Sequence, residues 1–391
     1  MATRQELEGR WQRLAAAGRE NDVDVILVYF DEYNMADGHY LTNIWTQFER
    51  GLVALATATA EVSLLVGPET ANFVMTHQPD LPSRIVSLFL AWGAGYPNTE
   101  WEEAADVLTE MVGHRPRRIG VVGSGALPAG LYQALTDISP HIVDLSAAVQ
   151  DARAIKSGSE IDNTRMAFNI VDAGLEAMID ALAPGMTETA LAGVGEGAMR
   201  AAGAQGYAYS TILTSQERSN SVFGRPTSRV LDNGSMLMIG ISPRYKGYCA
   251  SLGIPITLGE VSPERRQFIE NTLAVFRSVQ VQLRPGRMSA DIYRNSRAEL
   301  ARYGLEKHQI YGAVHSCGLL EAEAPFLSAD PNWELQPGMV LLIDLAVFHP
   351  QLWGIRWESG YLITDTGAEH LSGYFDKACE IVLQRAAQGI G

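Results

Sequence analysis

From residue 154 onward the sequence follows one order of segments twice: a pair of helices and then a group of strands. Ser157 or Ser159 can cap a first helix that runs to about Leu182, where Pro184 and Gly185 end it. Further helices are predicted at 187–203, 263–283 and 288–303, and apolar strands at 209–214, 235–242, 254–258, 339–348 and 360–364. This order predicts sheets covered by helices and suggests an internal duplication, although no clear sequence repeat accompanies it.

The first 150 residues alternate between helices and strands in a different way. Helices are predicted at 4–21 and 101–112, and strands at 23–30, 51–56, 62–66, 84–89 and 118–122. The polar residues 57–61 separate two of these strands and predict a hairpin. We therefore expect an α/β (α+β) fold, with a mixed-sheet N-terminal domain over residues 1–153 and a second domain over residues 154–391.

A glycine pair follows the strand predicted at 118–122, where a dinucleotide could bind. Gly123 and Gly125 begin the pattern G-x-G-x-x-G, but Pro128 stands where the third glycine belongs. No suitable acid follows at the distance that ribose recognition needs. The glycines are therefore interpreted as a turn between a strand and a helix.

Composition excludes several classes of partner and compartment. Thirty Lys and Arg against 45 Asp and Glu give a net charge of −15, which argues against nucleic acid or an anionic membrane as a partner. Three cysteines without a CxxC pair indicate reduced thiols, and hence a cytoplasmic protein. No apolar run reaches the length of a membrane span, and the charged, amphipathic N-terminus does not resemble a signal peptide.

A series of short motifs resembles the creatinase, prolidase and methionine-aminopeptidase superfamily, whose catalytic domain has the pita-bread fold. Each motif is weak alone, but together they keep the order and spacing of the family over nearly the whole chain. The motifs are Ala154-Ile155-Lys156-Ser157, Pro184-Gly185-Met186-Thr187-Glu188, Arg225-Pro226-Thr227-Ser228-Arg229, Gly247-Tyr248, Ala324-Pro325, Pro337-Gly338-Met339-Val340 and Gly354-Ile355-Arg356-Trp357-Glu358. The resemblance implies a creatinase-like N-terminal domain followed by a pita-bread domain.

Peptidases of this superfamily hold two metal ions with two Asp, one His and two Glu. Carried over one position at a time, the resemblance matches the His to His315 and the two Glu to Asp344 and Glu358. The two Asp positions hold Gly240 and Ser251, so both bridging carboxylates are missing. We therefore expect no dinuclear site and no cofactor, while a single ion on the three remaining residues stays open as an alternative.

The metal-free creatinases and ectoine hydrolases resemble the chain more than the peptidases do. His315-Ser316-Cys317-Gly318 is similar to a creatinase motif, and so is Phe48-Glu49-Arg50. In that family, the Phe and the Arg of the second motif close over the substrate in the partner subunit of a homodimer, and the Arg binds its carboxylate. Two departures disfavour creatine itself: Phe223 stands in place of the general base and Gly253 in place of a guanidinium-binding Glu.

The candidate catalytic residues are His315, Asp344 and Glu358. His315 could act as a general base oriented by Asp344 or Glu358, or Glu358 could itself be the base or nucleophile. Candidate substrate-binding residues are Phe48, Arg50, Phe223, Tyr248, Glu323 and Arg356. Glu323 and Glu321 flank Ala322, the position of a second family histidine. Whether Cys249 or Cys317 is a nucleophile stays open.

The leading hypothesis is a metal-independent, creatinase-like hydrolase that cleaves a C–N bond in a small carboxylate-bearing compound. One alternative is a mononuclear-metal hydrolase, a lyase or an Xaa-Pro-type (aminopeptidase P-like) peptidase on the same fold. Another is a catalytically inactive binding domain. The sequence does not name the substrate.

Overall fold

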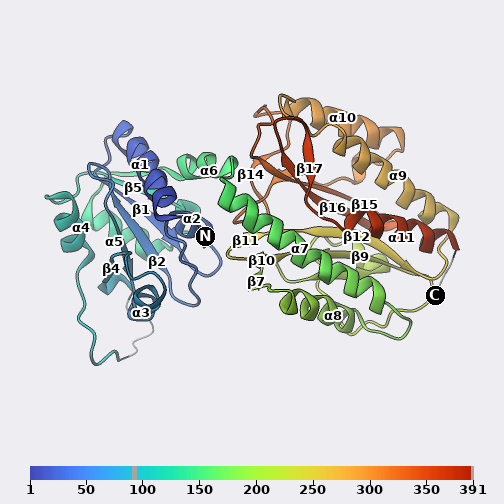
Figure 1. The fold of residues 1–391 in the computed structure, drawn as a ribbon, viewed down its shortest axis with the longest axis horizontal. Helices are drawn as coiled ribbons and strands as arrows, with labels where there is room; N and C mark the ends of the chain where they lie inside the picture. Colours follow the sequence, from blue (N-terminus) through green and yellow to red (C-terminus); the bar gives the residue numbers. More distant parts are fainter. Residues whose placement is uncertain (90–94, 389–391) are drawn as a thin grey trace. The chain divides into compact units, whose positions relative to one another are not determined.

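The computed structural model describes residues 1–89 and 95–388. The chain divides into two compact units, Met1–Arg153 and Ala154–Gly391, and each is described by itself (Figure 1). Among the described residues, no helix combines the length and the apolar character that crossing a membrane requires.

The first unit contains a mixed six-stranded sheet in the order β4-β3-β2-β1-β5-β6. Its strands are β1 (Val25–Phe30), β2 (Gly51–Ala56), β3 (Val62–Val66), β4 (Ser83–Ile85), β5 (Ile119–Val122) and β6 (Ile142–Asp144). The pairs β1–β2 and β2–β3 are antiparallel, which confirms the predicted hairpin, and β1–β5, β5–β6 and β3–β4 are parallel. Parallel strands need crossover helices between them, so a sheet of this kind is covered on both faces.

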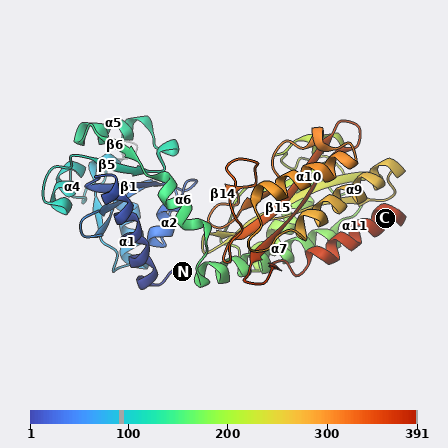
Figure 2. The same cartoon turned by 90° about the horizontal axis from the view of Figure 1, so that it is seen from above.

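Helices cover both faces of this sheet (Figure 2). They are α1 (Arg4–Glu20), α2 (Ala36–Thr42), α3 (Pro68–His77), α4 (Ala104–Val112), α5 (Ala129–Ile138) and α6 (Ser146–Ala154). Val25 and Leu27 of β1 pack with apolar residues of α4 and α5. Ile26 faces the other way, toward α1, where a Cβ on Gly18 would lie 2.9 Å from it. Alternate residues of one strand therefore anchor helices on opposite faces.

The second unit is built on an antiparallel sheet in the order β14-β13-β15-β16-β12-β9-β8, with β17 also paired to β16. The strands of this sheet are β8 (Ile212–Ser215), β9 (Ser235–Ile241), β12 (Leu252–Leu258), β13 (Val314–Ser316), β14 (Glu323–Phe326), β15 (Val340–His349), β16 (Trp353–Ile363) and β17 (Ala368–His370). A small three-stranded sheet adds β7 (Gly206–Tyr207), β10 (Pro243–Tyr245) and β11 (Tyr248–Cys249).

Long helices precede, separate and follow the groups of strands of this sheet in the sequence. They are α7 (Gly158–Ala181), α8 (Glu188–Ala201), α9 (Pro263–Gln280), α10 (Ser289–Arg302) and α11 (Phe375–Gln388). Of the two predicted caps of α7, Ser157 is the one used: it accepts a hydrogen bond from the backbone of Glu160, whose side chain accepts one from Ser157 in return. The two helix pairs predicted from sequence are thereby confirmed.

The two faces of β16 have different chemistry. Trp357 donates its indole N–H to the hydroxyl of Thr272 in α9 and packs against Phe375 of α11. Arg356 and Glu358 alternate with Trp357, so they lie on the face turned away from these helices. Polar groups on that face are nevertheless buried.

Two predicted strands differ from the structure, although the predicted α/β fold class is confirmed. The strand expected at 84–89 ends at Ile85, because Val86 forms only an isolated bridge with Glu102 and a 3₁₀ turn, Ser87–Phe89, follows. The strand expected at 360–364 begins earlier, at Trp353. Charged residues within β16 break the apolar pattern, yet they are buried because they neutralise one another.

Candidate active site

Three charged side chains meet on neighbouring strands of the second unit. The register of the sheet places Asp344 of β15 directly opposite Glu358 of β16, and Ala346 opposite Arg356. Residues opposite each other in a pair, and those two positions along on the same face, are close enough for their side chains to interact. Arg356 Nε lies 3.2 Å from Asp344 Oδ1, and its Nη1 lies 3.9 Å from Glu358 Oε2.

Two further groups approach from β13 and the loop that follows it. His315 Nε2 lies 3.8 Å from Glu321 Oε1 and 4.0 Å from Asp344 Oδ2. The other ring nitrogen, Nδ1, lies 3.1 Å from the carbonyl oxygen of Ser316. A carbonyl only accepts hydrogen bonds, so Nδ1 carries the proton. A backbone carbonyl therefore holds the ring through Nδ1, while Nε2 lies near Glu321 and Asp344.

Burial changes the acidity of the carboxyl groups. Glu358 is fully buried, and burial together with the neighbouring carboxyl groups of Asp344 and Glu321 raises its pKa well above the ordinary value. Burial likewise raises the pKa of Glu321. The carboxyl groups of Glu358 and Glu321 are hydrogen-bonded to each other, which requires that one of the two holds a proton.

The guanidinium of Arg356 lies where a first metal-binding Asp would project. A Cβ on Gly240 would lie 3.2 Å from Arg356 Nη1 and 3.4 Å from the hydroxyl of Tyr209. At the second Asp position, the Ser251 hydroxyl is paired with the same Tyr209 hydroxyl at 2.8 Å. Glycine offers no ligand and the serine is already bonded, so these residues do not fit a two-ion centre.

One set of residues does fit a single ion. A ligand atom from each of His315, Glu321 and Glu358 lies within 4.8 Å of the others. An imidazole and two carboxylates suit Zn²⁺ or Mn²⁺. Asp344, which the sequence placed in this set, instead lies beside Arg356.

Three of the predicted substrate-binding residues lie outside this cluster. The hydroxyl of Tyr248 donates to Glu160 of α7 at 3.2 Å. Glu323 is buried against Lys156, with Nζ and Oε1 3.0 Å apart, which makes it part of an internal ion pair. Phe223 is 81% exposed, so it does not form an apolar wall around the cluster.

The other two predicted substrate-binding residues belong to the first unit. Phe48 is 88% exposed and Arg50 is also exposed. Glu49 between them accepts a hydrogen bond from the backbone N–H of Thr70, at the start of α3. The motif is therefore anchored by its middle residue and presents the two others to solvent.

Neither candidate cysteine is suited to nucleophilic attack. Cys249 and Cys317 are both fully buried. Burial, followed by the proximity of Cys249, raises the pKa of the Cys317 thiol well above its ordinary value. A thiol of this kind stays protonated at neutral pH and is a small apolar filler.

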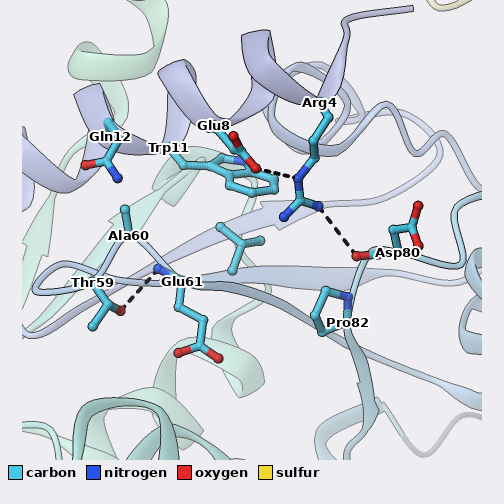
Figure 3. A pocket seen from close by; sticks show the side chains of 10 residues that line it. Arg4, Glu8, Trp11, Gln12, Thr59, Ala60, Glu61, Asp80 and Pro82 are labelled. Carbon is cyan, nitrogen blue, oxygen red and sulfur yellow. Dashed lines mark hydrogen bonds and ion pairs between the residues drawn. The ribbon is translucent and has the colours of Figure 1, made fainter.

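The first unit has a cavity of its own, of about 320 Å³. It lies between α1 and the strands, with Arg4 stacked over Trp11 and bonded to Glu8 (Figure 3). Its lining residues include none of those predicted from the motifs. The cavity is therefore separate from the acidic cluster.

Sequence reasoning missed three residues of the site. Glu321 was noticed only as a neighbour of a family histidine position. Tyr311, whose hydroxyl accepts a hydrogen bond from Arg356 Nη2 at 2.9 Å, and Tyr209 belong to no motif. Their only sequence signal is an aromatic residue in a loop, which is too common to be informative.

Comparison with known proteins agrees with the fold and the motif positions. Residues 162–365 match metallopeptidase family M24. The Xaa-Pro dipeptidase of Pyrococcus furiosus is 28% identical over 224 residues, and an uncharacterized Bacillus subtilis peptidase, YqhT, is 25% identical over 227 residues. The matches cover 57% and 58% of this chain, and 64% of each of these relatives.

Solved structures of similar fold cover nearly the whole chain. The prolidase of Pyrococcus horikoshii superposes with a TM-score of 0.80 at 21% identity, over 93% of this chain and 98% of that one. A variant of Escherichia coli aminopeptidase P superposes with a TM-score of 0.76 at 18% identity, over 98% and 99% of the two chains. This likeness confirms the predicted fold, and the family match over residues 162–365 confirms the predicted superfamily. The chain belongs to metallopeptidase family M24.

Proposed function

We propose that this protein hydrolyses a C–N bond of a small amide-like compound at the cluster of His315, Glu321, Asp344, Arg356 and Glu358. The observation that carries the proposal is the fully buried carboxyl group of Glu358, which lies beside the carboxyl groups of Asp344 and Glu321 and is hydrogen-bonded to Glu321. Buried carboxyl groups gathered in this way cost stability and are characteristic of sites that act on a reacting molecule. Membership of a hydrolase family supports the proposal.

Glu321 is the group that would accept a proton from the attacking water. Its side chain is 19% exposed, against 8% for Asp344 and 1% for Glu358, so water reaches it first. The water oxygen bonds to the carbonyl carbon, the C–N bond breaks, and the departing nitrogen takes the proton from Glu321. Arg356 stabilises the negative charge that develops on the carbonyl oxygen. A divalent ion, when bound, would polarise that same carbonyl.

The substrate we propose carries a carboxylate, which an arginine fork binds through two hydrogen bonds. Arg50 is our candidate for this contact, with Phe48 beside it, supplied by the second copy of a homodimer. The relatives include Xaa-Pro dipeptidases. That name favours a dipeptide ending in proline as a second class of substrate, and both classes contain a carboxylate beside the bond that is cleaved.

The metal-independent mechanism expected from sequence receives less support than the one-ion alternative. The family that matches is one of metallopeptidases, and three residues have the spacing that one ion needs. Turnover before and after dialysis against a chelator decides between the two mechanisms. Activity that is unchanged by dialysis supports the metal-independent mechanism, and activity restored only by Mn²⁺ or Zn²⁺ supports the other.

The proposal is tested with Glu321→Gln. The variant keeps the shape of the side chain but cannot accept a proton, so we expect kcat to fall by about 10²- to 10⁴-fold on whichever carboxylate-bearing amide is turned over. A matched control is Glu380→Gln, an exposed acid on α11, which should retain wild-type kcat. Wild-type turnover by Glu321→Gln would remove this residue from the reaction, and no turnover of any amide by the wild type would contradict the hydrolase.

A further inference from the structure

We infer that the cluster binds one divalent transition-metal ion, and that Glu321, from the loop after β13, is a ligand recruited in place of the two missing aspartates. The inference deepens the proposed function, because it concerns the same side chains. It differs from the two-ion arrangement of the superfamily in both the number of ions and the ligand set.

The imidazole of His315 has one ring nitrogen that can bind an ion. Its Nδ1–H donates to the Ser316 carbonyl, so in the neutral ring Nε2 carries a lone pair. That lone pair points at carboxyl oxygens of Glu321 and Asp344, 3.8 and 4.0 Å away. Together with Glu358, these ligand atoms have the spacing that a single cation between them needs. A metal-binding histidine usually donates its other ring N–H to a carbonyl or carboxylate group, as His315 does here.

A second candidate ligand is Glu358. Its side chain is 1% exposed, and its carboxyl group is hydrogen-bonded to that of Glu321. The nearest positive charge is the guanidinium of Arg356, whose Nη1 is 3.9 Å away. Its Nε lies beside Asp344, and its Nη2 donates a hydrogen bond to Tyr311. Glu358 therefore places a buried carboxyl oxygen within 4.8 Å of the ligand atoms of His315 and Glu321.

Arg356 limits the number of ions to one. It is a permanent cation beside the position where a first aspartate would hold an ion, and its Cγ and Cδ run past Gly253. A Cβ on Gly253 would lie 2.8 Å from both of these atoms, so the glycine makes room for the arginine. Asp344 Oδ1 is paired with Arg356, and the group of ligand atoms with the spacing of one ion contains His315, Glu321 and Glu358 without Asp344. The site then has ligands for a single ion.

The test measures Mn²⁺ binding to the metal-free protein without substrate. Electron paramagnetic resonance reports the concentration of free Mn²⁺, and calorimetry reports the affinity and the number of ions bound. We expect one Mn²⁺ per chain. Glu321→Gln and His315→Ala should each weaken binding at least tenfold, while Asp344→Asn should keep the stoichiometry and Glu380→Gln should bind like the wild type. Thermal unfolding of each metal-free variant shows whether it is folded.

Three results would overturn the inference: no saturable binding, two ions per chain, or wild-type affinity in Glu321→Gln. Binding is measured in the resting protein, so its outcome is independent of turnover. One bound ion without amide hydrolysis would contradict the proposed function alone, and chelator-resistant hydrolysis without a bound ion would contradict the metal site alone.

Discussion

At the scale of single residues, the site depends on two glycines that give Arg356 its place. Gly240 and Gly253 are paired with each other across β9 and β12, and Gly253 is also paired with Glu358 of β16. Any larger residue at Gly253 would meet the arginine stem and the Cβ of Glu358, which would be only 3.0 Å away. Because position 240 holds glycine and not aspartate, the guanidinium of Arg356 has the space that it occupies.

Gly253→Ala tests this arrangement. The added methyl group displaces Arg356 or Glu358, so we expect turnover to fall more than tenfold and the free energy of unfolding to drop by about 1–3 kcal/mol. Gly197→Ala is the matched control, because Gly197 lies on α8 with no atom near its Cβ position. That change should be neutral or stabilise by up to about 1 kcal/mol. Equal stability and turnover in Gly253→Ala and the wild type would show that the arginine needs no such space.

At the scale of elements, the first residue of α8 holds three segments together. The carboxylate of Glu188 accepts hydrogen bonds from the backbone and hydroxyl groups of both Ser215 and Thr227, and it pairs with Arg218. Burial alone would raise its pKa, but these bonds outweigh burial and lower the pKa below the ordinary value of 4.5. The helix start therefore fixes the end of β8 and the 3₁₀ turn, Gln216–Asn220, that follows it.

The lowered pKa gives Glu188→Gln a defined dependence on pH. A group whose folded pKa lies below its unfolded pKa stabilises the fold fully above the unfolded value, and this contribution is lost as the pH falls through the folded value. At neutral pH we expect the variant to lose about 1.5–3 kcal/mol in urea unfolding, and the difference from wild type to shrink below a pH of about 4.5. Glu196→Gln, on the same helix, should change neither quantity. A difference that stays constant down to the acid transition would contradict the stated role.

At the scale of the whole molecule, the exposed Phe48 points to a second copy of the chain. A large aromatic side chain that is 88% exposed, at a φ of 62°, is unusual on a protein that functions as a monomer. It lies two residues from Arg50, our candidate for the substrate carboxylate. The proposed homodimer explains why both side chains project outward on a rigidly held motif.

Co-expression of Arg50→Ala with Glu358→Gln tests the dimer. Each variant alone should be inactive as a homodimer. If Arg50 acts in the partner's site, mixed dimers contain one intact site, so about a quarter of wild-type activity should return. Light scattering of the wild type should give twice the chain mass of 42.6 kDa. A monomeric wild type, or no recovered activity in the mixed sample, would contradict this role of Arg50.

Local sequence patterns suffice to predict the fold class and the absence of the two aspartate ligands. The helix pairs, the hairpin of the first unit and the strands that carry the motifs follow from local periodicity and from caps such as Ser157, which depend on neighbours in the chain. The positions of Gly240 and Ser251 within these motifs also exclude two aspartates without any coordinates. Such conclusions need only residue identity and spacing.

Only the tertiary structure decided which side chains form the site. Glu321 and Glu323 are two residues apart, yet one joins the cluster and the other pairs with Lys156, which is remote in sequence. Phe223 occupies a family histidine position and Tyr248 belongs to the Gly247-Tyr248 motif, and the fold turns one to solvent and the other to Glu160. The direction of a loop side chain depends on strands paired across long sequence distances and on the cost of burying an uncompensated charge. Neither is a local property of the sequence.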